Sequence, residues 1–274
     1  MSLGSTIRRA RFRSRLFRYP VVRLRHRGLR PSDAFLVSYP RSGTTWLRFL
    51  LTHVLTGRPA DFDPLDQPVP YIGEHERAPA LLPESGRLVF SHEVTGAGDR
   101  RVIYVVRDPR AVALSEFRWL ERRALAPGSL DLFIRGFVRG RSNPWGSWDH
   151  HVVAWTQRES AREGRLHLVR FEDLKTETLN VLVDTVRFLG IDPPLELIRE
   201  AVADNTFERM RQKEEGAPDR AFAKGVQRQL PFVRAGSEGG WRDVLTNEHR
   251  VEIERAFGAV ARGVGYSIGS ELTT

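Results

Sequence analysis

The sequence predicts a three-layer α/β fold, in which helices flank a central, mostly parallel sheet. Apolar runs of strand length alternate along the chain with longer segments of helical spacing, an order typical of parallel sheets. One run, Arg101–Val106, is β-branched and uninterrupted, which favours a buried strand. Hydrophobic residues make up 41% of the 274 residues, enough for a substantial core. We find no internal repeat and expect one folded domain, residues 33–274.

Four segments are expected to be strands: Ala34–Ser38, Arg87–Ser91, Arg101–Val106 and Leu166–Phe171. Helical spacing covers residues 43–57, 110–123, 130–138, 147–163, 173–189, 195–203, 207–212 and 246–262. Residues 57–86 are rich in Pro, Asp and Gly and predict a long loop with short helical pieces. Ligands of parallel sheets bind at the carboxyl ends of the strands, so we expect functional groups directly after the first three strands.

The N-terminal segment, residues 1–32, is strongly basic. It holds ten of the chain's 43 basic residues and none of its 34 acidic ones, so the rest of the chain is close to neutral. One interpretation is an arm that contacts an acidic membrane surface or another polyanion. The alternative is a solvated extension. We expect no sequence-specific contact with nucleic acid, and the oligomeric state is left open.

Several classes of protein are disfavoured by what the sequence lacks. Without cysteine, the chain can form neither a disulfide framework nor a thiolate metal site. His150 and His151 have no further ligand at a plausible spacing, so we expect no metal. No run of eighteen apolar residues and no signal-peptide pattern is found, so we expect a cytoplasmic protein.

The loop Tyr39–Trp46 follows the first strand and opens a helix. Backbone N–H groups and the positive end of a helix dipole make such a turn a cradle for anions. The alternative is an ordinary strand-to-helix turn with a hydroxyl cap. The residues expected to contact an anion are Arg41, Ser42, Gly43, Thr44 and Thr45.

An ATP-binding loop fits this segment less well. The Walker pattern needs a lysine after its second glycine, whereas Thr44 follows Gly43 and no glycine lies five residues earlier. A kinase also needs a carboxylate for Mg²⁺, and the nearest strand-end candidate, Asp108, lies in an Arg-Asp-Pro-Arg turn. A kinase is therefore kept only as a minor alternative.

The loop instead resembles the 5′-phosphosulfate loop of sulfotransferases that use 3′-phosphoadenosine-5′-phosphosulfate (PAPS), usually written Tyr-Pro-Lys-Ser-Gly-Thr-Thr-Trp. Residues 102–119, VIYVVRDPRAVALSEFRW, resemble the 3′-phosphate motif of the same family. Further matches follow in the family's order at 146–155, 171–175, 205–210 and 234–241. The resemblance is to the cytosolic type. It implies a P-loop-like fold and metal-free, in-line sulfuryl transfer from PAPS to a hydroxyl acceptor, leaving 3′,5′-adenosine bisphosphate (PAP).

The resemblance implies two anion sites for this donor. Arg41 would contact the bridging oxygen and 5′-phosphate, and Thr44 and Thr45 would bind phosphate oxygens. Arg107 and Ser115 would bind the 3′-phosphate. The alternative for Arg107 is a structural salt bridge with Asp108 or Glu116. Arg234, Ala235 and Gly236 would contact the 3′-phosphate from its other side. In this segment, Ala235 replaces the family's lysine.

The resemblance also places an adenine slot between these sites. Aromatic faces stack on purines, and Trp46, Phe171 and Phe207 would line the slot, with Asn205 at its edge. Phe171 replaces the family's usual tyrosine. The alternative is that these aromatic residues belong only to the core.

The implied general base is His92, which follows the second strand. A hydroxyl loses its proton as it attacks sulfur, and a histidine that titrates near neutral pH suits that role. Glu93 is the alternative base. Phe90 stands where the family has a lysine, so one cation beside the sulfuryl group is missing. A binding protein that holds a bisphosphorylated nucleotide without turnover therefore remains an alternative.

Overall fold

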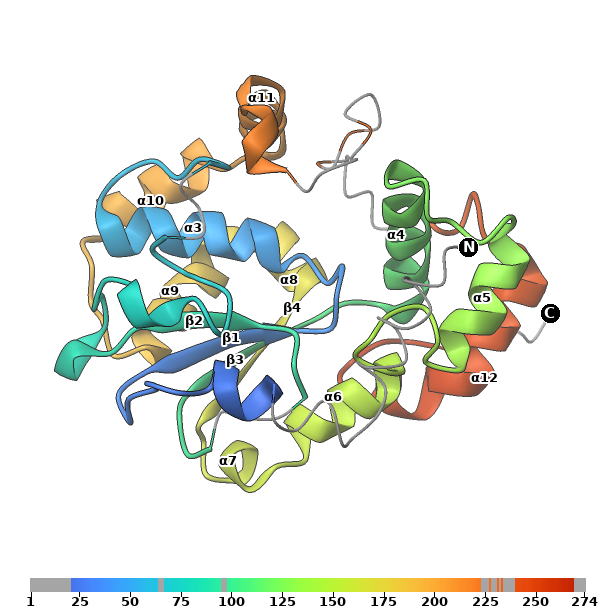
Figure 1. Cartoon of the computed structure of the whole chain (residues 1–274), viewed down its shortest axis with the longest axis horizontal. Coiled ribbons are helices and arrows are strands. Elements are labelled where there is room, and N and C mark those ends of the chain that lie inside the picture. Colours follow the sequence, from blue (N-terminus) through green and yellow to red (C-terminus); the bar gives the residue numbers. More distant parts are fainter. Residues whose placement is uncertain are drawn as a thin grey trace.

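A computed structural model describes residues 21–63, 67–94, 98–222, 227, 231, 233 and 240–268. Within them, a four-stranded parallel sheet has the order β2-β1-β3-β4 (Figure 1). All four expected strands are present, each within one residue of its expected bounds: β1 Ala34–Ser38, β2 Leu88–Ser91, β3 Val102–Val106 and β4 Leu166–Arg170. The predicted α/β fold with a parallel sheet is confirmed.

The helices also follow the expected order, but two expected helices are each divided. Residues 147–163 form α6 and α7, because Gln157 leaves helical geometry at φ −103° and ψ 9°. Residues 173–189 belong to α8 and α9, which meet at Glu177 with φ −128° and ψ 42°. The α-helices are α3 Thr44–Thr56, α4 Pro109–Arg122, α5 Leu130–Val138, α6 Trp148–Thr156, α7 Glu159–Arg162, α8 Phe171–Thr176, α9 Thr178–Phe188, α10 Leu195–Asp204, α11 Phe207–Gly216 and α12 Asn247–Gly263.

Three short 3₁₀ helices complete the secondary structure: η1 His75–Arg77, η2 Pro83–Ser85 and η3 Asp219–Ala221. The first two lie in the segment 57–86, where the sequence predicts a loop with short helical pieces. This expectation is confirmed.

Side chains alternate across the sheet and build a core on each face. Phe35 and Val37 of β1 pack with apolar residues of α4, α5, α6 and α12. Leu36, between them, packs on the other face with α3, α8, α9 and α10. Figure 1 shows α3 and α10 on one side of the sheet and α6 on the other. Both faces are covered, which explains why β1 and β3 are buried along their whole length and are almost entirely apolar.

The strand order also determines where a ligand can bind. The chain runs from β1 to β2 on one side and then crosses back to β3 on the other side of β1. In open parallel sheets, such a reversal leaves a crevice at the carboxyl ends of the two diverging strands. The loop after β1, His92 after β2 and Arg107 after β3 all begin at this edge.

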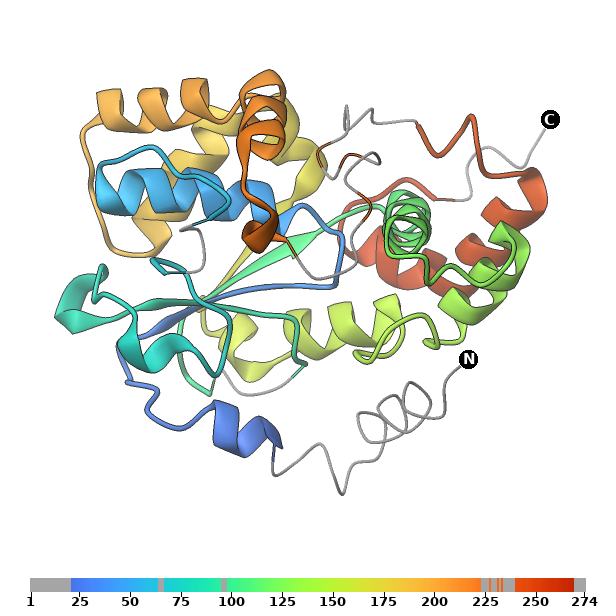
Figure 2. The same cartoon turned by 45° about the horizontal axis from the view of Figure 1, so that its top comes forward.

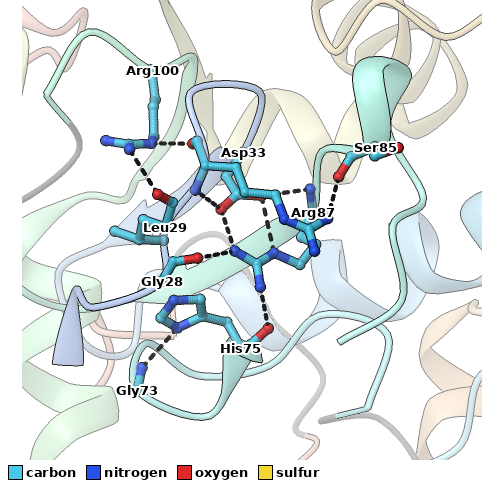
Figure 3. A network of polar contacts seen from close by, with 9 residues as sticks. Gly28, Leu29, Asp33, Gly73, His75, Ser85, Arg87 and Arg100 are labelled. Atoms are coloured by element: carbon cyan, nitrogen blue, oxygen red, sulfur yellow. Dashed lines mark hydrogen bonds and ion pairs between the residues drawn. The ribbon is translucent and has the colours of Figure 1, made fainter. Parts of the chain in front are cut away.

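The end of the basic N-terminal segment is attached to the domain through Arg87, which is only 2% exposed (Figure 3). The guanidinium of Arg87 donates to the carboxylate of Asp33 at 3.0 and 2.7 Å. It also donates to the carbonyls of Gly28 at 2.7 Å and His75 at 2.8 Å. The hydrogen bond to Gly28 thus crosses the expected boundary at residues 32 and 33, and it lies beside the buried ion pair of Arg87 with Asp33.

Residues 21–25 form a helical turn that lies on the α6 side of the sheet (Figure 2). Arg25 in this turn pairs with the buried carboxylate of Glu93 at 2.9 Å. Residues 1–20, which hold six of the ten arginines, lie outside the described residues. Among the helices that the structure describes, none has both the length and the apolar character needed to cross a bilayer. The cytoplasmic location stays a prediction.

Candidate active site

A cavity of about 1040 Å³ opens at the carboxyl ends of the strands. This volume is at the upper end of the range for small-molecule sites, so it can hold a nucleotide together with part of an acceptor. Ten of the residues predicted from the sequence line it: Arg41, Gly43, Thr44, Thr45, Trp46, His92, Arg107, Ser115, Phe171 and Phe207.

The other predicted residues lie elsewhere. Ser42 is buried beside the cavity, within the same loop. The side chain of Asn205 does not line the cavity. Arg234, Ala235 and Gly236 lie outside the described residues, although Gly240 and Trp241, a few positions later, line the cavity.

The loop after β1 is bent by two residues with left-handed backbone geometry. Gly43 has φ +95°, and a Cβ atom there would lie 2.1 Å from a ring carbon of Phe171, so no larger residue fits. Arg41 has φ +70°, which is unusual for a residue with a side chain. Such strain is characteristic of functional sites. The turn brings the backbone close to Phe171 and opens α3 directly afterwards.

The N-terminus of α3 is available to an anion. No side chain caps this helix, so the expected alternative of a hydroxyl-capped turn is wrong. Thr44 Oγ1 donates to Ser38 Oγ. The buried Ser42 Oγ has no hydrogen-bond partner among the described residues. A buried hydroxyl without a partner is costly, and a bound phosphate oxygen would satisfy it.

Arg41 and Arg107 approach each other from neighbouring strands. Arg41 Nε donates to Ser115 Oγ at 3.3 Å, and Arg107 Nη1 donates to the carbonyl of Arg41 at 3.3 Å. The guanidinium of Arg107 lies 4.2 Å from the ring centre of Phe171. Burial lowers the pKa of Arg107, and the carboxylate of Glu172 opposes that change. The structure therefore brings residues of both predicted anion sites into contact at the cavity.

A structural salt bridge does not account for Arg107. Asp108 pairs with Arg110 at 2.8 Å, and the carboxylate of Glu116 accepts hydrogen bonds from Asn143. Arg107 Nε is buried without a hydrogen-bond partner among the described residues. A buried guanidinium with an unused donor fits an anionic ligand. Ser42 Oγ and Arg107 Nε are thus two buried donors that an anionic ligand would satisfy.

His92 lines the cavity and is held in one tautomer. Its Nδ1 lies 2.7 Å from the carbonyl oxygen of Ser38. A carbonyl only accepts, so Nδ1 carries the proton and Nε2 of the neutral ring keeps its lone pair. Burial is the main cause that lowers the pKa of His92 to about 4, and the charges of Arg48 and Arg41 act in the same direction. At neutral pH the ring is therefore an uncharged proton acceptor.

Glu93, the alternative base, is held away from the cavity. Its Oε1 accepts from Arg25 at 2.9 Å, and its Oε2 lies 3.6 Å from His26 Nε2. The residue is buried and does not line the cavity. Its contacts are instead with the N-terminal segment.

Arg48 provides a positive charge beside Phe90, the position at which the sequence lacks the family's lysine. The guanidinium of Arg48, from α3, lies 4.7 Å from the ring centre of Phe90. Its charge is among the causes that lower the pKa of His92. A positive charge thus lies near the end of β2 even though it comes from a different element.

Trp46 and Phe171 form an aromatic wall of the cavity. Their ring centres are 6.2 Å apart in an edge-to-face arrangement. The indole of Trp46 donates to the carbonyl of Asn205 at 2.7 Å. The side-chain amide of Asn205 donates to the carbonyl of Ala201 instead of facing the cavity. Asn205 thus contacts Trp46 through its backbone and does not line the cavity, whereas Phe207 does line it.

The structure adds a chain of contacts that the sequence does not reveal. Glu116 lines the cavity although it is only 3% exposed, and its carboxylate accepts from Asn143 Nδ2 at 3.0 Å. The amide oxygen of Asn143 accepts from the backbone of Trp145 at 2.9 Å, and the Trp145 ring lies 5.3 Å from His92. Burial raises the pKa of Glu116 to about 7, against the hydrogen bonds and the charge of Arg41.

His151 supports the same region from α6. Its Nε2 lies 3.0 Å from the backbone carbonyl of His92, and its Nδ1 lies 2.8 Å from the hydroxyl of Tyr104. The side chain is fully buried. Among the described residues, no group of three or more histidines, cysteines and acids could hold a metal ion.

Comparison with known proteins places the chain in a family. The model of the sulfotransferase domain matches residues 31–265. Human sulfotransferase 1E1 is 27% identical over 245 residues, covering 79% of each chain. A flavonol sulfotransferase-like protein of Flaveria bidentis is 24% identical over 265 residues, covering 86% of this chain and 83% of the relative.

Solved structures have the same fold. Mouse sulfotransferase SULT7A1, complexed with PAP, has a TM-score of 0.67 at 21% identity, covering 85% of this chain and 86% of that one. Retinol dehydratase in complex with androsterone and PAP has a TM-score of 0.68 at 20% identity, covering 89% and 84%.

The chain therefore belongs to the sulfotransferase domain family. It is an enzyme of the PAPS-dependent class, with PAPS as the sulfuryl donor and PAP as the product.

Proposed function

We propose that the donor lies across the cavity with its phosphosulfate end at residues 41–45 and its 3′-phosphate at Arg107 and Ser115. The observation that carries this assignment is the convergence of two guanidinium groups, from the adjacent strands β1 and β3, on one cavity beside an uncapped helix N-terminus. Trp46, Phe171 and Phe207 then offer apolar faces to the adenine. Arg234, Ala235 and Gly236 stay predictions for the remaining side of the 3′-phosphate.

Arg41 is proposed to act on the leaving group. As the sulfur–oxygen bond to the donor phosphate breaks, negative charge grows on that phosphate. The guanidinium of Arg41, fixed by Ser115, stabilises this charge. Because arginine stays protonated at neutral pH, it contributes charge and hydrogen bonds and does not supply a proton.

His92 is proposed to take the acceptor's proton on Nε2 while the acceptor oxygen forms its bond to sulfur. The hydrogen bond from Nδ1 to the Ser38 carbonyl fixes the ring for this role. A base with a pKa near 4 is weak. Negative charge of the donor beside Arg41 would counter the cations that lower the pKa of His92, and would raise it toward the operating pH.

The acceptor is proposed to be a small molecule with a hydroxyl group that enters beside His92. Phe90 and Trp145 line the cavity beside His92 and give this part of it an apolar, aromatic character. The one relative named for a flavonol, and the solved structure that contains androsterone, are consistent with a small-molecule acceptor.

Contact of the N-terminal arginines with an acidic membrane or another polyanion also remains a proposal. It is supported by the ten arginines of residues 1–32 and by the exposure of Val21 and Leu24 at the end of that segment. Sedimentation of the full chain with anionic vesicles, but not with neutral ones, would support it.

The donor orientation predicts discrimination between PAP and AMP, which differ by the 3′-phosphate alone. Charged hydrogen bonds contribute enough for PAP to bind about 10- to 100-fold more tightly than AMP. In Arg107→Met this ratio should fall toward one, because the cation at the 3′-phosphate is removed. Calorimetric titration of both proteins measures it. An unchanged ratio in Arg107→Met would place the 3′-phosphate elsewhere.

Glu116 predicts a pH dependence of PAP affinity. With a pKa of about 7, its carboxyl group ionises as the pH rises from 6 to 8 and adds negative charge beside the donor's phosphates. The affinity of the parent protein for PAP should therefore decline from pH 6 to pH 8. Relative to Glu116→Gln, whose side chain does not ionise, the decline should be about fivefold. The phosphates of PAP titrate in the same range, so the measured quantity is the ratio of the two dissociation constants at each pH. A ratio that does not change with pH would contradict the prediction.

A further inference from the structure

The cavity lining includes arginines beyond the two assigned to the donor. Besides Arg41 and Arg107, its lining includes Arg118, Arg123 and Arg141. Among the described residues that line the cavity, Glu116 is the only acidic one, and its carboxylate already accepts hydrogen bonds from Asn143.

Among the described residues, no ion pair accounts for these three arginines. Arg122, which also lines the cavity, is buried and pairs with Glu214 at 2.9 Å. Arg118, Arg123 and Arg141, by contrast, are at least partly exposed. In the part of the chain that the structure describes, no carboxylate lies within ion-pair distance of any of the three. Like charges that share a cavity repel each other, and an anion placed among them removes that repulsion.

Two of the three, Arg118 and Arg123, follow Ser115 in and directly after α4. On α4, Arg118 follows Ser115 by three residues and therefore lies on the same helix face. Arg123 comes eight residues after Ser115, a rise of about 12 Å along a helix. Its guanidinium lies 5.7 Å from the ring centre of Trp119. The same ring lies 5.1 Å from the guanidinium of Arg41, so Trp119 connects the reacting end with the outer arginines.

Arg141 reaches the same region from the segment between α5 and α6. Two residues later, Asn143 holds the backbone of Trp145, and the ring of Trp145 lies against His92. Arg141 thus lines the cavity from the same segment that contacts the proposed base.

We propose that the acceptor carries an anionic oxyacid group, such as a carboxylate, phosphate or sulfate, in addition to its reacting hydroxyl. Arg118, Arg123 and Arg141 bind this group, while the hydroxyl lies at His92. Guanidinium forks suit the planar or tetrahedral oxygens of such groups. The inference rests on the proposed function, because it takes the acceptor end from the position of His92.

The test uses matched pairs of acceptors that differ only in charge: 4-hydroxyphenylacetate and its amide, 6-hydroxyhexanoate and its amide, and methyl glucuronide and its amide. Binding to the PAP-loaded full chain is measured by calorimetry, and sulfation with PAPS by mass spectrometry. We expect the anionic member of at least one pair to bind about tenfold more tightly than its amide. That preference should decrease as NaCl is raised.

Arg118→Gln and Arg123→Gln should each remove most of the preference and leave PAP affinity unchanged. Arg139→Gln is the matched control, because Arg139 is exposed and does not line the cavity. Equal binding of acid and amide in all three pairs would overturn the proposal, as would loss of PAP affinity in Arg118→Gln, which would assign that arginine to the donor. Failure of the proposed function would be a separate result: no discrimination between PAP and AMP, and no sulfated product from any pair.

Discussion

His92→Ala should lower kcat by about 10²- to 10⁴-fold, the range that a positioned general base contributes. Nε2 of His92 is the proposed proton acceptor, because Nδ1 is committed to the carbonyl of Ser38. PAP affinity should stay within about twofold of the parent protein, since His92 is not assigned to the phosphate sites. Stopped-time assays with saturating PAPS and acceptor measure kcat, and calorimetry measures PAP binding.

Two control variants separate this role from alternatives. His150→Ala changes an exposed histidine on the same helix as His151 and should leave kcat unchanged. Glu93→Gln should retain most of kcat, although it removes the partner of Arg25 and should lower the thermal midpoint. If Glu93→Gln abolished turnover while His92→Ala retained it, the base would be wrongly assigned.

The pH profile follows from the same residue. In the free enzyme, His92 is protonated only below a pKa of about 4. The value of kcat/KM for PAPS, which reports the free enzyme, should therefore not fall until the pH approaches 4. The donor's charge raises the pKa of His92 in the complex, so the acid limb of kcat should lie at higher pH than that of kcat/KM. Coincident limbs would contradict the proposed effect of the donor.

Arg41→Met should lower kcat by about 10²- to 10³-fold, comparable to the loss of one preorganised donor at an oxyanion. The guanidinium is placed by a strained backbone, with φ +70°, and by the hydrogen bond of Nε to Ser115. Arg41→Lys restores the charge without the fork and should recover a large part of kcat. A higher KM for PAPS with unchanged kcat in Arg41→Met would mean that Arg41 only binds the ground state.

The fold could be predicted from the sequence because β1, β2 and β3 are almost entirely apolar runs. The parallel sheet buries both faces of β1 and β3, so their side chains leave a clear local signal. The divisions between α6 and α7 and between α8 and α9 could not be predicted. Each depends on the dihedral angles of one residue, Gln157 or Glu177, and neither residue is a glycine or proline.

The site divides in the same way. The loop at residues 39–46 and the pair Arg107 and Ser115 lie in contiguous motifs, so the residues themselves indicated an anion site. Arg48 beside Phe90, and Glu116 with Asn143, are contacts between elements far apart in sequence. Their partners become neighbours only when the helices pack, so no local pattern could identify them.

Sulfuryl transfer itself tests the central claim most directly. The full chain is incubated with PAPS, without added metal, and with the acceptor pairs, and the products are separated by mass spectrometry. We expect one acceptor to gain the mass of a single sulfuryl group, with one equivalent of PAP formed, and the rate at which both products form to fall at least about 100-fold in Arg41→Met and His92→Ala. Tight PAP binding with no sulfated acceptor in the parent protein, or transfer undiminished in both variants, would contradict the account.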